Sequence, residues 1–219
     1  MKKLLMILFS MILVIGCVGL TACGGSESGS ESETTSEDIN EETAAPTIFY
    51  GGYGYMGDDP VVGAVYEYVA TVLPESYDVS KDMVSIPVVK IIDTVENDDG
   101  TVDVYGVFQI FNYTVDGDTL MTESGGSYGG KMHLVKDETA QVEAYKVESF
   151  EQVGDGSEFD KTAKEIFGDN YDAFMKAYSN DKALEKRRAK TIANYVQATG
   201  LDVTQYQDYG WDPVKIPTK

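Results

Sequence analysis

The spacing of hydrophobic residues changes three times along the chain, and each change marks the start of a new kind of segment: a helix, then strands, then helices again. Residues 4–22 form one apolar run of nineteen residues without a charge. Residues 59–73 place apolar side chains three or four positions apart, which predicts an amphipathic helix. The spacing shortens to two over residues 83–152, which predicts strands, and returns to the helical period over residues 160–199.

Residues at both ends of the first predicted helix support its bounds. Asp58 and Asp59 precede Pro60, which together form an N-cap signal with a proline in the first helical turn. Pro74 cannot continue a helix, so we expect the helix to end before it.

Four segments in the central region have the composition of strands, since they are rich in Val, Ile, Tyr, Phe and Thr. Short turns separate them and join antiparallel neighbours, so we expect a four-stranded meander. Pro87 cannot donate to a strand ladder, so the first strand lies at an edge of the sheet or starts after this residue. The predicted strands are 83–95, 102–114, 119–135 and 139–152.

Four glycines lie inside the third predicted strand. They are Gly125, Gly126, Gly129 and Gly130. Glycine within a strand often marks a bulge or the close approach of another group. We expect a sharp bend that curls the sheet around the first helix, with a ligand approach as the alternative.

The C-terminal region returns to helical spacing. We expect short helices at 160–167 and 171–178, separated by Gly168, and a longer helix at 181–199 between Asn180 and Gly200. The chain therefore predicts an α+β fold, in which an N-terminal helix packs on a curved four-stranded antiparallel sheet and additional C-terminal helices follow. An irregular aromatic tail with Tyr206, Tyr209 and Trp211 closes the chain.

The longest predicted helix carries the densest basic cluster of the chain. We expect its four cations to pair with neighbouring acids on a solvated face. They are Lys186, Arg187, Arg188 and Lys190.

Charge separates the predicted domain from the segment before it. Residues 24–46 hold seven acids and no base among Ser, Thr and Gly, so we expect a disordered tether. The chain has a formal net charge of -20, which becomes -22 when residues 1–22 are removed with Lys2 and Lys3. This negative excess argues against binding to nucleic acids or to an anionic membrane surface.

The N-terminal apolar run follows two lysines, as in a secretory signal. An uncleaved transmembrane helix is the alternative, because about 20 apolar residues can cross a bilayer. No cationic anchor follows the run, which instead ends in Leu20-Thr21-Ala22-Cys23 before Gly and Ser. These four residues resemble the bacterial lipobox.

The lipobox resemblance implies cleavage after Ala22 and attachment of a diacylglyceryl group to Cys23. The mature protein would then be anchored to the cell membrane on its extracytoplasmic face. Cys17 is the competing attachment site, but it would leave apolar residues on the mature terminus. We therefore predict a signal peptide at 1–22, a lipidated tether at 23–46 and a single domain at 47–219.

Neither catalytic nor metal-binding patterns fit the predicted domain. Both cysteines of the chain precede it, and His133 is the only histidine. Ser127 lies in a Gly-x-Ser-x-Gly pattern, but a strand follows where a nucleophile elbow needs a helix. Residues around Gly100, Gly117 and Gly156 fit calcium loops poorly and predict turns. We expect no cofactor and no metal site.

Two groups of aromatic residues suggest recognition. Residues 47–57 interleave four aromatics with four glycines, which could form a ligand platform or a strand laid across the core. The predicted ligand- or partner-binding residues are Tyr50, Tyr53, Tyr55, Tyr209 and Trp211.

These features favour a non-catalytic binding or interaction module with a protein or cell-wall partner. A small-ligand pocket or an enzyme near His133 and the glycine bends is the first alternative. An assembly element that uses the open face of the sheet is the second.

The order of elements over residues 58–152, a helix followed by a four-stranded meander, resembles the cystatin-like and nuclear-transport-factor-like group. That resemblance implies a helix packed on a curved sheet. The predicted C-terminal helices depart from the simple form, and the group includes enzymes, ligand binders and interaction modules.

Overall fold

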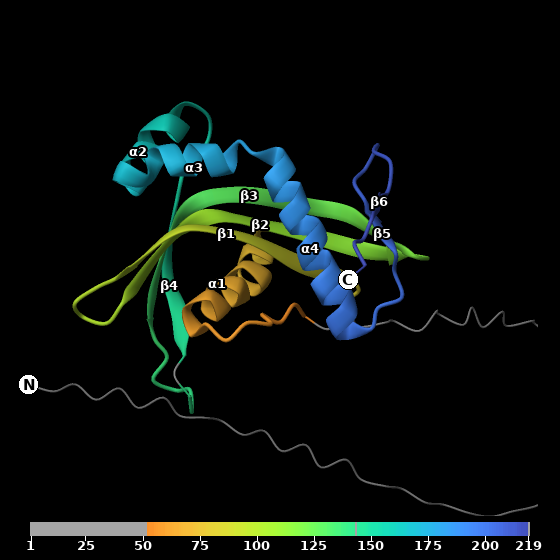
Figure 1. The fold of residues 1–219 in the computed structure, drawn as a ribbon, viewed down its shortest axis with the longest axis horizontal. Coiled ribbons are helices and arrows are strands. Elements are labelled where there is room, and N and C mark those ends of the chain that lie inside the picture. Colours follow the sequence, from red (N-terminus) through yellow and green to blue (C-terminus); the bar gives the residue numbers. More distant parts are fainter. Residues whose placement is uncertain (1–51, 143, 219) are drawn as a thin grey trace, which may run out of the picture. The chain divides into compact units, whose positions relative to one another are not determined.

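The computed structural model describes residues 52–142 and 144–218. One helix, four strands and three helices follow in the predicted order, and two short strands come after them (Figure 1). The α+β class is therefore confirmed. The predictions for the signal peptide 1–22, Cys23, the tether 23–46 and Tyr50 lie outside the described residues.

The helical elements are α1 (Pro60–Thr71), α2 (Phe159–Phe167), α3 (Tyr171–Tyr178) and α4 (Asp181–Thr199), with short 3-10 turns at Leu73–Ser76, Gly156–Glu158 and Gly168–Asn170. The strands are β1 (Val84–Glu96), β2 (Val102–Asp116), β3 (Thr119–Lys136), β4 (Tyr145–Gln152), β5 (Gln205–Gln207) and β6 (Val214–Lys215).

The start of α1 follows from its capping residues. The Asp59 carboxylate accepts hydrogen bonds from the backbone N–H groups of Val61 at 2.9 Å and Val62 at 3.2 Å, which satisfies donors that have no partner inside the helix. Pro74 lies in the 3-10 turn that follows, so α1 ends slightly earlier than the predicted limit of residue 73.

Strands β1 to β4 form the predicted antiparallel meander. β1 lies at an edge of the sheet and contains Pro87, so the first of the two predicted arrangements is confirmed. β4 starts at Tyr145 rather than at residue 139. The Asp137 carboxylate accepts hydrogen bonds from the backbone N–H and hydroxyl of Thr139, which turns the chain there.

The prediction of a four-stranded, purely antiparallel sheet is wrong, because the sheet has six strands. β4 pairs only with the C-terminal part of β3, from Gly130 to Lys136. At the other end of β3, β5 pairs with it in parallel, and β6 pairs with β5. The tail predicted as irregular therefore extends the sheet. Three-residue and two-residue strands are too short to show the alternation that predicts a strand.

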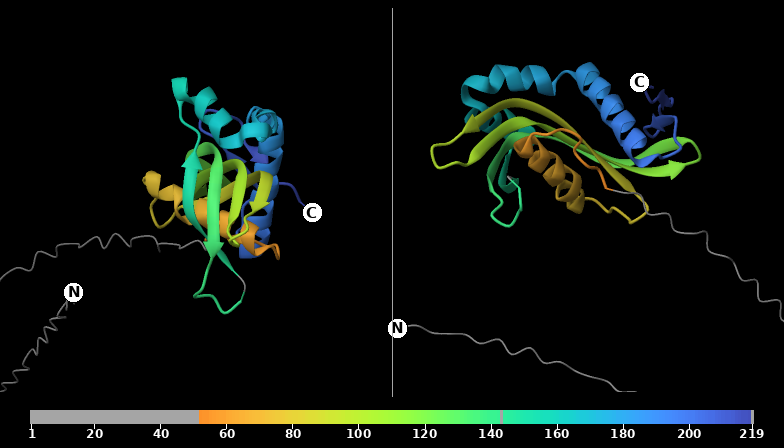
Figure 2. Two further views of the ribbon diagram at one scale, coloured as in Figure 1. Left: turned by 90° about the vertical axis from the view of Figure 1, so that its left-hand side faces the viewer. Right: turned by 60° about the horizontal axis from the view of Figure 1, so that its bottom comes forward.

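Helices cover both faces of the sheet. Phe108 belongs to the core beneath α1, whereas its neighbour Val107 belongs to the core beneath α2 and α3, since successive residues in a strand point to opposite faces. α4 packs against β1 and the C-terminal strands in a third cluster, which includes Ile192 and Tyr206. The strands bend around α1 (Figure 2).

The glycines of β3 fit the bend interpretation, because protein atoms fill the space beside them. A Cβ atom on Gly129 would lie 2.5 Å from the ring of Phe174. A Cβ atom on Gly130 would lie 2.3 Å from the carbonyl oxygen of Glu151 and 2.6 Å from the ring of Phe150. At these two positions the glycines admit aromatic rings and a neighbouring strand, not a ligand.

Candidate functional site

The C-terminal strands present two predicted aromatic residues on a tight turn. The backbone N–H of Trp211 donates to the carbonyl of Asp208 at 3.1 Å, and Gly210 has a φ of 80° at the third position of the turn. A positive φ at this position is what a type II turn requires, and glycine adopts it readily. The side-chain amide of Gln207 donates to the carbonyl of Trp211 at 2.7 Å, which holds the turn further.

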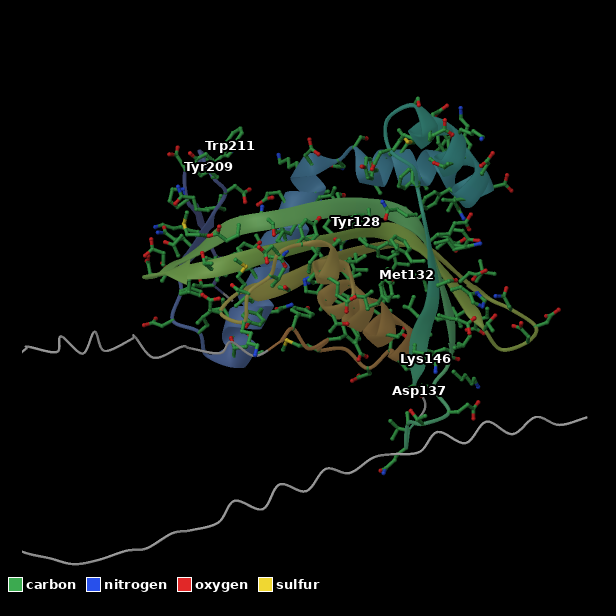
Figure 3. All side chains as sticks on the ribbon, turned by 180° about the vertical axis from the view of Figure 1, so that it is seen from behind. Tyr128, Met132, Asp137, Lys146, Tyr209 and Trp211 are labelled. Carbon is green, nitrogen blue, oxygen red and sulfur yellow. The ribbon has the colours of Figure 1, made fainter. Side chains whose placement is uncertain are left out.

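Both aromatic side chains point outward from this hairpin. Tyr209 is 94% exposed and Trp211 is 75% exposed. Figure 3 shows them at the outer end of the hairpin, remote from Asp137 in the turn before β4. Trp and Tyr supply much apolar contact area and a polar group, so their exposure on an ordered turn suits recognition.

A buried arginine fixes the base of the hairpin to the sheet. Arg188 of α4 is only 2% exposed. Its Nη1 and Nη2 donate to the two carboxylate oxygens of Asp208 at 2.9 and 2.7 Å, in a bidentate pair. Its Nε donates to the hydroxyl of Tyr113 at 2.8 Å, and Nη2 also donates to Thr122 at 2.8 Å.

Aromatic rings enclose the same guanidinium. Its central carbon lies 3.9 Å from the ring centre of Phe111 and 5.0 Å from that of Tyr206. These contacts combine cation–π attraction with exclusion of water. Arg188 thus links α4 with β2, β3 and the hairpin, and we call Arg188 with Asp208 the arginine clasp.

The prediction that the whole basic cluster lies on a solvated face is wrong for Arg188. Leu184, Arg188 and Ile192 follow one another at four-residue steps, so Arg188 belongs to the buried stripe of α4. That spacing is the signal that could have identified it. A solvated role was the simpler interpretation because the adjoining residues are cationic.

The arginine clasp makes the stability of the fold depend on pH. Hydrogen bonding from Arg188 holds the pKa of the Asp208 carboxyl below its ordinary value of about 3.9. A carboxyl with a lowered pKa stabilises the fold above its unfolded pKa, and this contribution is lost as the pH falls through the folded pKa. We therefore expect stability from this carboxyl to persist at neutral pH and to fall below about pH 4.

Urea unfolding between pH 7 and pH 2.5 would measure this dependence. Asp208→Asn should lower stability at pH 7 and flatten the loss on acidification. Asp212→Asn changes the same charge in the same hairpin, where the described structure gives the carboxylate no ion pair, and serves as the matched control. Equal acid dependence in the Asp208→Asn variant and the unaltered protein would contradict the prediction.

The predicted residues Tyr53 and Tyr55 form a separate group from the hairpin. Tyr53 stacks on Tyr66 at 5.5 Å and on Tyr195 at 6.5 Å, and Tyr55 stacks on Tyr66 at 5.1 Å. Residues 52–57 form no helix or strand, so the predicted strand across the core is wrong in this described part. Successive glycines favour an irregular backbone, and ring stacking holds it against α1 and α4.

The Ser127 and His133 positions confirm the rejection of a nucleophile elbow. Both residues lie on the continuous strand β3, six residues apart, which corresponds to about 20 Å along a strand. His133 Nδ1 instead lies 2.6 Å from the carboxylate of Asp103 on β2. Across the ranges 52–142 and 144–218, no group of three or more His, Cys, Asp or Glu residues could hold a metal ion. Gly100 and Gly117 occupy turns between strands, as predicted.

Comparison with protein-family models, with curated proteins and with solved structures gives no match to this chain. No helix in the part of the chain that the structure describes is long and apolar enough to cross a membrane.

Proposed function

We propose that this protein is a lipid-anchored, extracytoplasmic binding module. Its partner would be a protein on the outer side of the cell membrane, bound through Tyr209 and Trp211. The observation that carries this proposal is the exposure of both rings on a turn that the arginine clasp fixes.

The rigid display of these rings supports binding over a purely structural role. Side chains that contribute to the core are buried, whereas Tyr209 and Trp211 lie mostly in solvent. An ordered turn also loses little conformational entropy on association, which favours affinity. Few interface residues supply most of the binding energy, and Trp and Tyr are prominent among them.

The anchor is the second part of the proposal and rests on the lipobox resemblance at Leu20-Thr21-Ala22-Cys23. A diacylglyceryl group provides the two acyl chains that stable membrane attachment needs. Mass spectrometry of protein extracted from membranes should find a chain that begins at a lipidated Cys23. A mature chain without lipid, or with lipid on Cys17, would contradict this part.

Site-specific crosslinking in intact cells would test the binding surface. A photoreactive residue at position 209 or 211 of the full-length protein should give one defined protein adduct. The same residue at position 142 is the matched control, because Val142 is also an exposed apolar residue, 77% in solvent, in the turn before β4. Equal adducts at all three positions, adducts with wall polysaccharide alone, or no adduct would contradict a protein partner at the hairpin.

Affinity for the crosslinked partner would then test the two rings. Trp211→Ala should weaken binding by about 30-fold or more, the loss typical of a central tryptophan. The midpoint of urea unfolding should remain unchanged, because the ring makes no core contact among the clusters described. Val142→Ala should change neither quantity, and unchanged affinity in Trp211→Ala would remove the hairpin from the interface.

A further inference from the structure

A hollow beside α4 lacks acidic lining although the chain is strongly acidic. The chain has 37 Asp and Glu residues against 17 Lys and Arg residues. The hollow has a volume of about 250 Å³, and no Asp or Glu lines it. We call it the tyrosine–arginine hollow; its lining residues that matter here are Tyr53, Tyr55, Tyr66, Arg187, Lys190 and Asn194.

The polar wall of the hollow comes from one side of α4. Arg187, Lys190 and Asn194 follow at steps of three and four residues, which places them on the same helix face. Within the described ranges, neither Arg187 nor Lys190 has a carboxylate within ion-pair distance. Two positive charges and one side-chain amide are therefore available to a ligand on this wall.

The opposite wall is aromatic. Tyr55 stacks on Tyr66, and Tyr66 stacks on Tyr53, so the three rings support one another. Burial raises the pKa of Tyr66, and the charge of nearby Arg187 acts in the opposite direction. The Tyr66 hydroxyl consequently remains protonated at neutral pH and adds no negative charge to the hollow.

A second hollow, which shares Arg187 with the first, is also lined by cationic residues and by no acidic residue. It also has a volume of about 250 Å³, and its cationic residues are Lys90, Lys176 and Arg187. Cationic residues therefore line both hollows along α4, which favours an anion there. Asp58, Asp59 and Glu67 line a different hollow, which adjoins Tyr53 and Tyr55.

The dimensions and the two unlike walls define the class of ligand. Pockets for drug-sized molecules usually have volumes of about 300–1,000 Å³, so this hollow suits a ligand with a single ring. Aromatic faces pack against the apolar surface of a ring, while arginine and lysine bind phosphate or carboxylate.

We propose that the tyrosine–arginine hollow binds a monosaccharide-sized ring that carries one phosphate or carboxylate group. The ring packs against Tyr55, which is supported from behind by its stacking on Tyr66, and Arg187 and Lys190 hold the anionic group. This site is separate from the hairpin surface, so each can fail without the other.

Ligand-observed NMR titration of the purified full-length protein in a neutral detergent would test this site. The probes are glucose 6-phosphate and glucuronate, with glucose and inorganic phosphate as the matched partial ligands. At least one acidic sugar should bind with a dissociation constant of about 1 mM or lower, which corresponds to about −4 kcal/mol. Both partial ligands should bind at least tenfold more weakly, and the better acidic sugar identifies the anionic group.

Two double variants separate the site from the general charge of α4. Arg187→Gln with Lys190→Gln should weaken binding by at least about tenfold, because charge-assisted hydrogen bonds are lost. Lys182→Gln with Lys186→Gln removes the same charge from positions that do not line the hollow, and should leave affinity within about twofold. Circular dichroism of both variants would verify that these exposed substitutions preserve the fold.

Several results would overturn the proposal. They are no binding of either acidic sugar at 10 mM, equal binding of glucose, equal binding of inorganic phosphate, and equal loss of affinity in the two double variants. Absence of binding would exclude the site, and equal binding of glucose would exclude a role for the cations. Equal binding of inorganic phosphate would exclude a role for the aromatic wall. Equal loss of affinity in the two double variants would show that only net charge matters.

Discussion

Replacement of Arg188 by alanine should lower the free energy of unfolding by about 2–5 kcal/mol, the range typical of truncating a large buried side chain. The substitution would leave Asp208 without its bidentate partner and Tyr113 and Thr122 without a hydrogen-bond donor. It would also remove the guanidinium that stacks on Phe111 and leave a cavity there. The cavity destabilises the fold in addition to the unpaired polar groups.

Arg188→Lys should recover only part of this loss. A lysine ammonium is a point charge on a flexible chain and cannot make the planar, bidentate contact with Asp208 while also reaching Tyr113. Urea unfolding followed by circular dichroism would measure the series. Lys186→Ala, an exposed cation two residues earlier on α4, is the control and should change stability by no more than about 0.5 kcal/mol.

A stability loss in Arg188→Ala no larger than that in Lys186→Ala would show that the clasp contributes nothing to the stability of the fold.

A second measurement separates global stability from the local order of the hairpin. The fluorescence anisotropy of Trp211, the only tryptophan of the chain, should fall well before global unfolding in Asp208→Ala, because the hairpin loses its attachment to α4 and the exposed indole becomes more mobile.

Replacement of Gly130 by alanine should also destabilise the protein, by about 1–3 kcal/mol or more, as overpacked sites do. The added Cβ atom would lie 2.3 Å from the carbonyl oxygen of Glu151. That oxygen belongs to the backbone of β4, so side-chain rotation cannot relieve the contact. The strands must separate or shift, which weakens the pairing of β3 with β4.

Gly54→Ala is the matched control for this prediction, since no atom lies within 4 Å of the position its Cβ atom would take. Its stability should remain unchanged or rise slightly, because alanine restricts the unfolded chain more than glycine does. The midpoints of thermal and urea unfolding would compare the two variants. Equal midpoints would mean that the sheet adapts to the methyl group without cost.

The sequence predicted the elements whose signals are local. α3 and α4 have the predicted bounds, and Asp59 caps α1 as the N-cap signal predicted. Gly200 ends α4 in the left-handed conformation with a φ of 68°, which glycine adopts at low cost. These features depend on a few consecutive residues, so the chain alone carries the information.

Features that depend on distant pairing were missed. β5 and β6 owe their existence to contacts with β3 and with each other, and their own residues show no sufficient alternation. Arg188 was assigned to a solvated face because its neighbours in the sequence are basic, although its neighbours in space are Phe111, Tyr113 and Asp208.

The structure divides the predicted binding residues that it describes into two groups. Tyr209 and Trp211 are both exposed on one turn, where Gly210 separates them. Tyr53 and Tyr55 form a different group, because residues 52–57 lie between α1 and α4, where Tyr53 stacks on a ring of each helix. The sequence pattern places these aromatic residues in one candidate set, and only the structure separates them into two groups.

The parallel pairing of β5 with β3 has a consequence for the order of folding. Thr119 and Gln205 are 86 positions apart, and closing a loop of this length is entropically costly and slow. β5 is synthesised after β3, so the N-terminal end of β3 has a free edge that can associate with other chains until the hairpin pairs with it. Tyr209 and Trp211 acquire their fixed positions only when β5 has paired with β3. A partner that recognises the ordered hairpin would thereby distinguish molecules in which β5 has paired with β3 from those in which it has not.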